Sequence, residues 1–166
     1  MEESLMALIK IRGDLLESKA DFICHQVNCM GVMGSGVALQ VKNKWPDVYL
    51  DYLVKTNWQQ VHGKPENLLG TTTFTKVGDN QRVVNMFAQP GYGYDGRRYT
   101  NYEAFARCLE NIYTESNPGD TIAFPRLIGC DRGGANWKII KMMIEEILVD
   151  RDIEIYCLKG GPEECQ

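Results

Sequence analysis

Runs of apolar and β-branched residues alternate along most of the chain with segments of helical spacing. Six runs predict strands, at residues 4–11, 21–27, 69–77, 82–88, 121–125 and 153–158. The run at 21–27 is apolar at nearly every position up to Cys24, as expected of a strand that is covered on both faces. The turn sequence Gly78-Asp79-Asn80 separates two of the runs, so residues 69–88 are predicted to form a hairpin.

Four segments between the strands predict helices, at residues 37–45, 47 to about 55, 100–113 and 137–148. Pro46 suits the first position of a helix, and Thr100 with Glu103 matches a capping box. Residues 89–98 are too rich in glycine for regular structure and are predicted to form a mobile lid. The alternation predicts the α/β class, with a mixed sheet between helical layers, in one domain spanning residues 1–166 with a polar tail at 159–166.

Two glycine-rich loops each connect the end of a predicted strand to the start of a predicted helix. The first contains Gly31, Gly34 and Gly36, and the second covers residues 129–134. Glycine lets the backbone approach a ligand closely, and the unpaired N–H groups at a helix start attract negative charge, so each loop could hold a phosphate. The alternative is that the glycines form tight turns that pack a helix on the sheet. The first loop matches neither the dinucleotide fingerprint nor the P-loop.

Several polar residues lie at or near these loops, and each has two interpretations. Asn28 could bind a ribose hydroxyl or orient water, or it could satisfy the backbone of a turn. His25 could act as a general acid or base, or be a hydrogen-bonded core residue. Asp14 could accept hydrogen bonds from an amine such as adenine N6, or cap a helix or turn. Asp131 and Arg132 could activate water and contact phosphate, or be solvated loop charges.

Composition limits the class of protein. The hydrophobic content of 44% is sufficient for a core without metals or disulfides, and the net charge of −4 argues against general affinity for nucleic acid. No apolar run approaches the ~20 residues that span a bilayer, so we expect a cytoplasmic protein with no membrane partner. The six cysteines are scattered, which favours free thiols over disulfides or a zinc site; Cys24, Cys108 and Cys157 are predicted to be core residues. We expect neither a metal nor a cofactor.

Taken together, these motifs resemble the macrodomain family, which binds ADP-ribose at the strand ends of a three-layer α/β/α fold. The resemblance rests on Gly13-Asp14-Leu15, on Asn28 followed by residues 34–38, on Phe124-Pro125 and on residues 129–137. Residues 32–40 followed by Trp45-Pro46 look like one branch of the family. That branch holds the ADP-ribose 1''-phosphate phosphatases, the terminal ADP-ribose glycohydrolases and the antitoxin enzymes that remove ADP-ribose from DNA.

The resemblance implies a set of ligand contacts. Asp14 would bind the adenine amine with Leu15 in the same motif, Leu158 would lie beside the adenine, and Asn28 would bind the distal ribose. The remaining contacts would surround the phosphates and the distal ribose, and come from Gly34, Ser35, Gly36, Val37, Gly129, Cys130, Asp131, Arg132, Gly133 and Gly134.

The sequence departs from the glycohydrolase pattern at two places. Those relatives use a lysine shortly after the strand at 83–88, where this chain has Gln89-Pro90, and some use an aspartate where this chain has Gly133. We therefore expect hydrolysis of ADP-ribose 1''-phosphate to ADP-ribose, with His25 supplying a proton and Asn28 and Asp131 completing the catalytic group. The alternatives are removal of ADP-ribose from a protein or nucleic acid, and a non-enzymatic reader of ADP-ribosyl marks.

Overall fold

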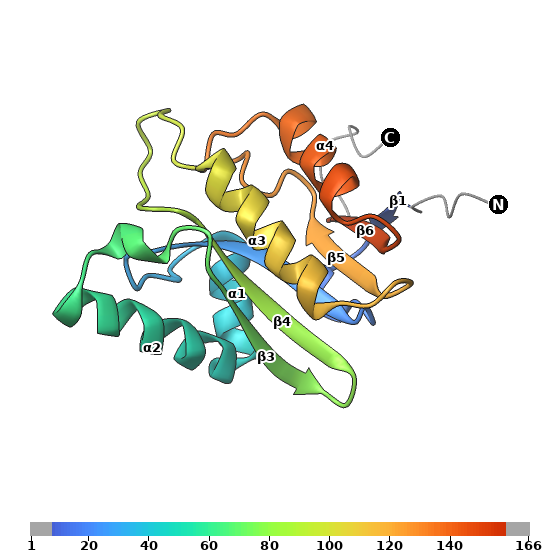
Figure 1. The fold of residues 1–166 in the computed structure, drawn as a ribbon, viewed down its shortest axis with the longest axis horizontal. Coiled ribbons are helices and arrows are strands. Elements are labelled where there is room, and N and C mark those ends of the chain that lie inside the picture. The colour runs from blue at the N-terminus through green and yellow to red at the C-terminus, as the bar shows by residue number, and fades with distance from the viewer. Residues whose placement is uncertain (1–7, 159–166) are drawn as a thin grey trace.

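Six strands form one mixed sheet in the order β1-β6-β5-β2-β4-β3. The computed structural model describes residues 8–158 (Figure 1). The strands are β1 (Leu8–Arg12), β2 (Phe22–Asn28), β3 (Thr72–Gly78), β4 (Gln81–Gln89), β5 (Thr121–Pro125) and β6 (Asp152–Cys157). Neighbouring strands are parallel except for the β3–β4 hairpin, which is antiparallel as predicted. The carboxyl ends of the five parallel strands therefore share one edge of the sheet, where ligands bind in open α/β folds.

Helices cover both faces of this sheet. They are η1 (Leu15–Glu17), α1 (Gly36–Lys44), α2 (Pro46–His62), η2 (Pro65–Leu68), α3 (Tyr102–Glu115) and α4 (Trp137–Ile147). Helices α3 and α4 pack on one face and α1 and α2 on the other (Figure 1). The predicted α/β class and its layered arrangement are confirmed. Helix α2 is longer than predicted, because the segment after Lys55 has no helix breaker before Gly63.

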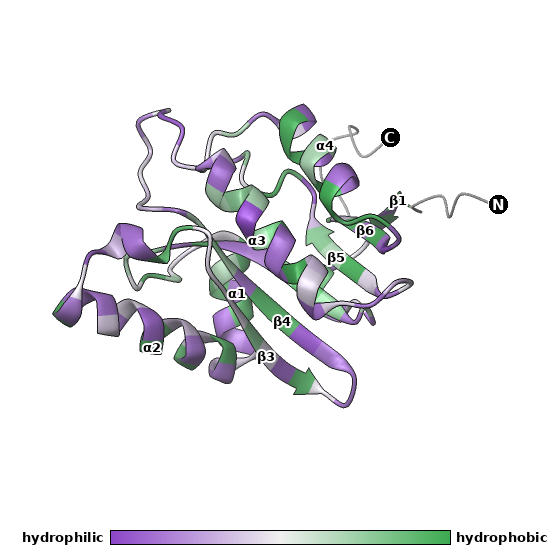
Figure 2. Ribbon diagram, viewed as in Figure 1, coloured by the Kyte–Doolittle hydropathy of each residue, from purple (hydrophilic) through white to green (hydrophobic). Residues whose placement is uncertain are grey.

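The central strand β2 is apolar because both of its faces are buried. Phe22 and Cys24 belong to the core beneath α3 and α4, whereas Ile23 and Val27 pack beneath α1 and α2. Hydrophobic colouring accordingly runs along β5 and much of β4 in the middle of the molecule (Figure 2). The sheet thus holds the loops after β2, β4 and β5 on a rigid platform.

Two sequence predictions need correction. The first strand ends at Arg12, one residue beyond the predicted run at 4–11; its predicted residues 4–7, like the tail at 159–166, lie outside the described residues. The cap of α3 is Asn101, whose side chain accepts the Ala104 N–H at 2.9 Å, and not Thr100. The Thr100 hydroxyl instead donates to the Gly129 carbonyl at 2.7 Å, so a tertiary contact replaces the predicted cap.

The cysteine prediction is correct at four positions and wrong at one. Free thiols are found at Cys24, Cys29, Cys108 and Cys130, whereas Cys157 is disulfide-bonded. The spacing of cysteines in a sequence does not reveal which of them meet in the fold, which is why the pattern missed this bond. Within residues 8–158, the helices are too short or too polar to cross a bilayer.

Candidate functional site

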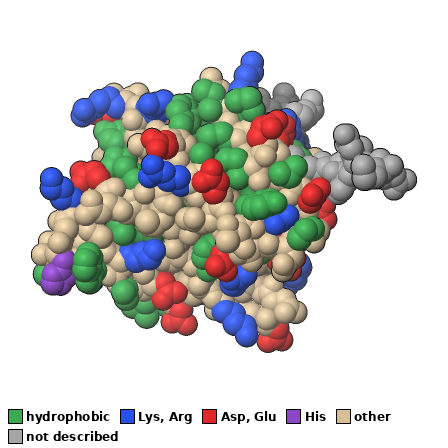
Figure 3. Space-filling model, viewed as in Figure 1, with side chains coloured by type: hydrophobic (Ala, Val, Ile, Leu, Met, Phe, Trp, Pro, Cys, Tyr) green, Lys and Arg blue, Asp and Glu red, His purple; other side chains and the backbone are tan. Residues whose placement is uncertain are grey.

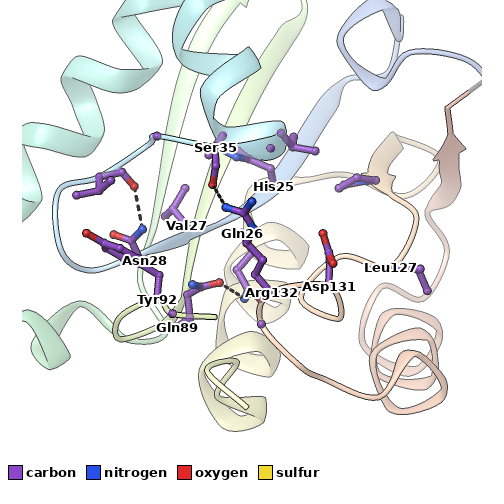
Figure 4. Close-up of a pocket in the computed structure, with 18 of the residues that line it drawn as sticks. His25, Gln26, Val27, Asn28, Ser35, Gln89, Tyr92, Leu127, Asp131 and Arg132 are labelled. Carbon is purple, nitrogen blue, oxygen red and sulfur yellow. Dashed lines mark hydrogen bonds between the residues drawn. The ribbon is translucent and has the colours of Figure 1, made fainter. Parts of the chain in front are cut away.

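The two glycine-rich loops border one cleft at the carboxyl edge of the sheet (Figure 4). Its volume is about 430 Å³, which is within the usual size range of small-molecule sites. The end of β2 and the loop after it contribute Asn28 and residues 34–37. The end of β5 and the loop after it contribute residues 125–127 and 131–133. The end of β4 and the segment after it contribute Gln89 and residues 92–94. Loops that are about 100 residues apart in the chain therefore form one site.

The first glycine loop is held by a buried tyrosine from α2. The Tyr52 hydroxyl accepts the N–H groups of Gly31 and Val32 at 3.0 and 2.9 Å, and it donates to Asn28 Oδ1 at 2.8 Å. Asn28 also accepts the Met30 N–H at 3.0 Å and donates to the Val32 carbonyl at 2.8 Å. Asn28 thus forms hydrogen bonds with the backbone of the turn, which was one of the two roles predicted for it. It also lines the cleft.

Sequence reasoning missed Tyr52. The available signal was its place on the inner face of α2, between Val48 and Thr56 at four-residue spacing, where a hydroxyl needs a partner. Burial raises the pKa of Tyr52, so the hydroxyl keeps the proton that it donates to Asn28.

Helix α1 begins at the cleft without a side-chain cap. Ser35 occupies the capping position, yet within residues 8–158 its hydroxyl caps no N–H group; it accepts Arg132 Nη1 at 2.5 Å. Gly36 has a φ of 58°, which favours glycine, and Gly36 and Val37 line the cleft. The first turn of α1 therefore directs its positive dipole end at the cleft, which suits an anion.

The second glycine loop packs closely against the segment before α3. The Gly133 carbonyl accepts the N–H groups of Tyr99 and Thr100 at 2.8 and 2.9 Å. A Cβ atom on Gly133 would overlap the Thr100 hydroxyl and the Gly129 carbonyl. Gly133 thus allows close packing of the loop, which was the predicted alternative to a phosphate cradle. That packing positions the neighbouring Asp131 and Arg132 at the cleft.

A glutamine network connects the cleft walls. Gln26 Nε2 donates to Gln89 Oε1 at 2.7 Å and to Thr100 Oγ1 at 2.8 Å, and Gln89 Nε2 donates to the Gly91 carbonyl at 2.8 Å. Gln26 Oε1 is buried with no hydrogen-bond partner in the described part of the chain. Both glutamines line the cleft. The sequence analysis did not identify Gln26; a polar residue in an apolar central strand was the signal.

His25 is buried at the wall of the cleft, and its surroundings decide which nitrogen carries the proton. Nε2 lies 2.5 Å from Asn85 Oδ1. The Asn85 amide donates to the Val48 carbonyl at 3.1 Å, which leaves Oδ1 facing the imidazole, so Nε2 carries the hydrogen. Nδ1 is then an unprotonated acceptor, and it has no partner among the described residues.

Burial lowers the pKa of His25 from 6.5 to about 4, against the opposing effect of the Asn85 hydrogen bond. At neutral pH the ring is therefore uncharged. This geometry favours a hydrogen-bond or proton acceptor, which is the reverse of the proton-donating role predicted from the sequence.

The buried histidine should make folding sensitive to acid. The unfolded chain binds a proton near pH 6.5 and the folded chain only near pH 4. Above about pH 6.5 the His25 ring is neutral in both the folded and the unfolded chain, and the full unfolding free energy is present. As the pH drops to about 4, protonation of the unfolded chain should lower the unfolding free energy by up to about 3 kcal/mol. His25→Gln should remove this component, measured as the difference between urea unfolding curves at pH 7 and pH 4.5.

His62→Gln is the matched control, since it makes the same substitution at an exposed position. Equal pH dependence in the wild type and in His25→Gln would contradict the assignment of a neutral buried imidazole.

Arg132 bridges the mouth of the cleft. Its guanidinium donates to Ser35 and lies 4.6 Å from the ring centroid of Tyr94, so it contacts the first glycine loop and the segment after β4 at once. Asp131 is exposed and points into the cleft beside Arg132 (Figure 4). The mouth therefore combines a cation with an acid and an aromatic ring.

Six of the predicted site residues do not line the cleft. Of the described residues, these are Asp14, Leu15, Gly129, Cys130, Gly134 and Leu158. Asp14 caps η1 by accepting the Leu16 N–H at 2.9 Å, and Leu15 is buried in the core beneath α1 and α2. Asp14 and Leu158 follow the ends of β1 and β6, which are neighbours at the edge that carries the cleft. A ligand longer than the cleft could reach them there.

The cysteines of the two loops are poor nucleophiles. Burial raises the pKa of the Cys130 thiol to about 11 and that of Cys29 to about 12. Both thiols stay protonated at neutral pH, so neither supplies a thiolate.

Comparison with known proteins agrees with this architecture. A family model described as Macro domain matches residues 24–144. The macrodomain of Thermus aquaticus DarG is 26% identical with a TM-score of 0.70, covering 90% of this chain and 97% of that one. A protein of unknown function from Bacteroides thetaiotaomicron is 26% identical with a TM-score of 0.75, covering 91% and 98%. The chain belongs to the macrodomain family, which is the ADP-ribose-binding family that the motifs resembled.

Curated relatives carry names that describe an activity. A DNA ADP-ribosyl glycohydrolase from Thermus aquaticus is 31% identical over 149 residues, which is 83% of this chain and 37% of that protein. One from Mycobacterium tuberculosis is 27% identical over 154 residues, 90% of this chain and 42% of that protein. This chain thus spans about two-fifths of the length of these relatives.

Proposed function

We propose that this macrodomain binds ADP-ribose in the cleft and hydrolyses a derivative of it. The observation that carries the proposal is that both glycine-rich loops and the uncapped start of α1 line the same cleft. Several backbone N–H groups and Arg132 suit a diphosphate better than a single phosphate. The names of the curated relatives support hydrolysis of an ADP-ribosyl bond as the general class of reaction.

In this proposal the diphosphate lies along the start of α1, next to the Arg132 guanidinium that the Ser35 hydroxyl holds at the mouth of the cleft. The distal ribose lies toward Asn28 and residues 34–37, at the deep end of the cleft beside His25. The adenine extends past the ends of β5 and β6 toward Asp14 and Leu158. The cleft volume of about 430 Å³ supports a ligand whose adenine end continues along the sheet edge.

The first candidate substrate is ADP-ribose 1''-phosphate. Water attacks the phosphorus atom, the bond from phosphorus to the C1'' oxygen breaks, and ADP-ribose and inorganic phosphate leave. Asp131 orients the attacking water, while backbone N–H groups stabilise charge on the phosphate oxygens. The leaving C1'' oxygen takes a proton from the attacking water, because the His25 ring is uncharged at neutral pH and its Nε2–H is held by Asn85.

The position of Gln89 supports a mechanism without a lysine nucleophile. Gln89 is the last residue of β4, at the place where the glycohydrolase relatives were expected to use lysine, and both ends of its amide are engaged by Gln26 and Gly91. The second candidate is nevertheless removal of ADP-ribose from DNA or protein, and the names of the curated relatives favour DNA. In that reaction, water would attack C1'' of the ribose, the bond from C1'' to the acceptor would break, and the acceptor would leave with a proton from the water.

Turnover separates these candidates. We expect the protein to release phosphate from ADP-ribose 1''-phosphate, and Asp131→Asn to lower that rate by about 10²-fold, a typical contribution of a positioned acid or base. The affinity for ADP-ribose, measured by calorimetry, should stay within about twofold, because backbone groups supply most contacts. Asp79→Asn, in the β3–β4 turn, is the matched control.

The other outcomes are equally informative. Release of ADP-ribose from ADP-ribosylated DNA or protein, with ADP-ribose 1''-phosphate intact, would replace the first candidate with the second. Binding of ADP-ribose without turnover of any of these substrates would identify a reader module.

A further inference from the structure

Helix α2 has apolar residues on the side that faces away from the protein. Its inner side buries Val48, Tyr52 and Thr56. On its outer side are four residues that we call the outer stripe, which are Leu50, Val54, Trp58 and Val61, exposed by 55%, 69%, 57% and 76%. A surface helix normally has polar residues there. Figure 3 shows green side chains along the lower left of the molecule, where Figure 1 places α2.

The outer stripe is narrow and straight. At 100° per residue its four side chains fall within an arc of about 80°, over a length of about 17 Å. This spacing is typical of a helix that packs along another helix. None of its members lines the cleft, and the hydrogen bonds of α2 to the first glycine loop come from Tyr52 and Gln60, which are not part of the outer stripe.

The ends of the outer stripe are symmetric about a point between Lys55 and Thr56, and Val54 and Trp58 depart from this symmetry by one position. Leu50 and Val61 are equally far from that point, and so are Asp47 at the start of α2 and Lys64 just beyond its end. Asp47 and Lys64 are both exposed and have no ion-pair partner within residues 8–158. A surface of this kind is complementary to a copy of itself that runs in the opposite direction.

We propose that the outer stripe of α2 binds the outer stripe of a second copy of this chain, with the two helices antiparallel about a two-fold axis. Leu50 of one copy packs against Val61 of the second copy, and Val54 packs against Trp58 of the second copy. Asp47 lies near Lys64 of the second copy at each end. Antiparallel helices also oppose their dipoles favourably.

Charge complementarity selects a second copy over an unrelated partner. A foreign helix would need a basic group at one end and an acidic group at the other, at the same spacing that this chain supplies by symmetry. An interface of one helix per copy is small, so the dimer should be weak and reversible. Both clefts stay open, because the carboxyl edge of the sheet does not take part.

Sedimentation velocity of the full chain, from about 10 µM to about 1 mM, tests the proposal across the range of weak interfaces. We expect the wild-type sedimentation coefficient to rise with concentration toward that of a dimer. Val54→Glu should remain monomeric throughout, because two carboxylates would face each other near the axis. Met142→Glu, at another exposed apolar position, on α4, should behave as the wild type.

A charge swap tests the antiparallel arrangement itself. Asp47→Lys and Lys64→Glu should each weaken association at least about threefold, and the double variant should recover it. Circular dichroism confirms that each variant folds. A wild type that is monomeric over the whole range, a Val54→Glu variant that still dimerises, or a double variant without recovery would overturn the proposal.

Discussion

Gly133→Ala is expected to weaken ADP-ribose binding at least about 100-fold, equivalent to ~2.7 kcal/mol. The added Cβ would overlap the Thr100 hydroxyl and the Gly129 carbonyl, and one of these contacts is with backbone that cannot rotate away. The second glycine loop must then move off the segment before α3, and Asp131 and Arg132 move with it. Overpacking of this kind also costs ~1–3 kcal/mol of folding stability.

Gly91→Ala is the matched control for this variant. Gly91 also lies beside the cleft, but its added Cβ would meet open space, and its φ is not in the left-handed region. Calorimetric titration with ADP-ribose should give a wild-type affinity for Gly91→Ala and no measurable heat for Gly133→Ala at micromolar protein. Wild-type affinity in both variants would show that the second loop does not contribute to the ligand site.

Tyr52→Phe is expected to reduce ADP-ribose affinity about 10- to 100-fold and to lower unfolding free energy by ~2–4 kcal/mol. The substitution keeps the buried ring and removes only the hydroxyl. The N–H groups of Gly31 and Val32 would lose their acceptor, and Asn28 Oδ1 would lose a donor. The first glycine loop would then no longer be held in the shape that borders the cleft.

Tyr49→Phe controls for the loss of a tyrosine hydroxyl on the same helix. Its ring stacks against Tyr52 with centroids 6.2 Å apart, yet its hydroxyl does not contact the loop. Urea unfolding and ADP-ribose titration of the two variants should therefore differ clearly. If Tyr52→Phe and Tyr49→Phe bind ADP-ribose equally well, the loop keeps its shape without the phenol.

The elements that depend on local patterns were predictable from the sequence. The β3–β4 hairpin follows from two β-branched runs around a turn, and α3 and α4 follow from apolar spacing over several turns. The buried character of β2 follows from the apolar run Phe22 to Cys24 at its start. These signals are local because a strand or helix places neighbouring side chains by its own geometry. The expected meeting of the two glycine loops also follows, since both come after parallel strands.

What the candidate site can do depends on contacts between distant residues. The proton acceptor at His25 exists because Asn85, 60 positions further along, orients the imidazole, and because the fold excludes water from it. The first glycine loop is held by the Tyr52 hydroxyl on α2. The Thr100 hydroxyl donates to the Gly129 carbonyl and does not cap α3 as predicted.

Thus the sequence by itself determined the α/β class, the order of the elements and the two glycine loops at one edge of the sheet. The tertiary structure alone decided which groups are hydrogen-bonded, which are protonated and which face the cleft. The physical reason is that periodicity reports the geometry of one element, whereas burial and hydrogen-bond partners arise only when elements far apart in the chain pack together.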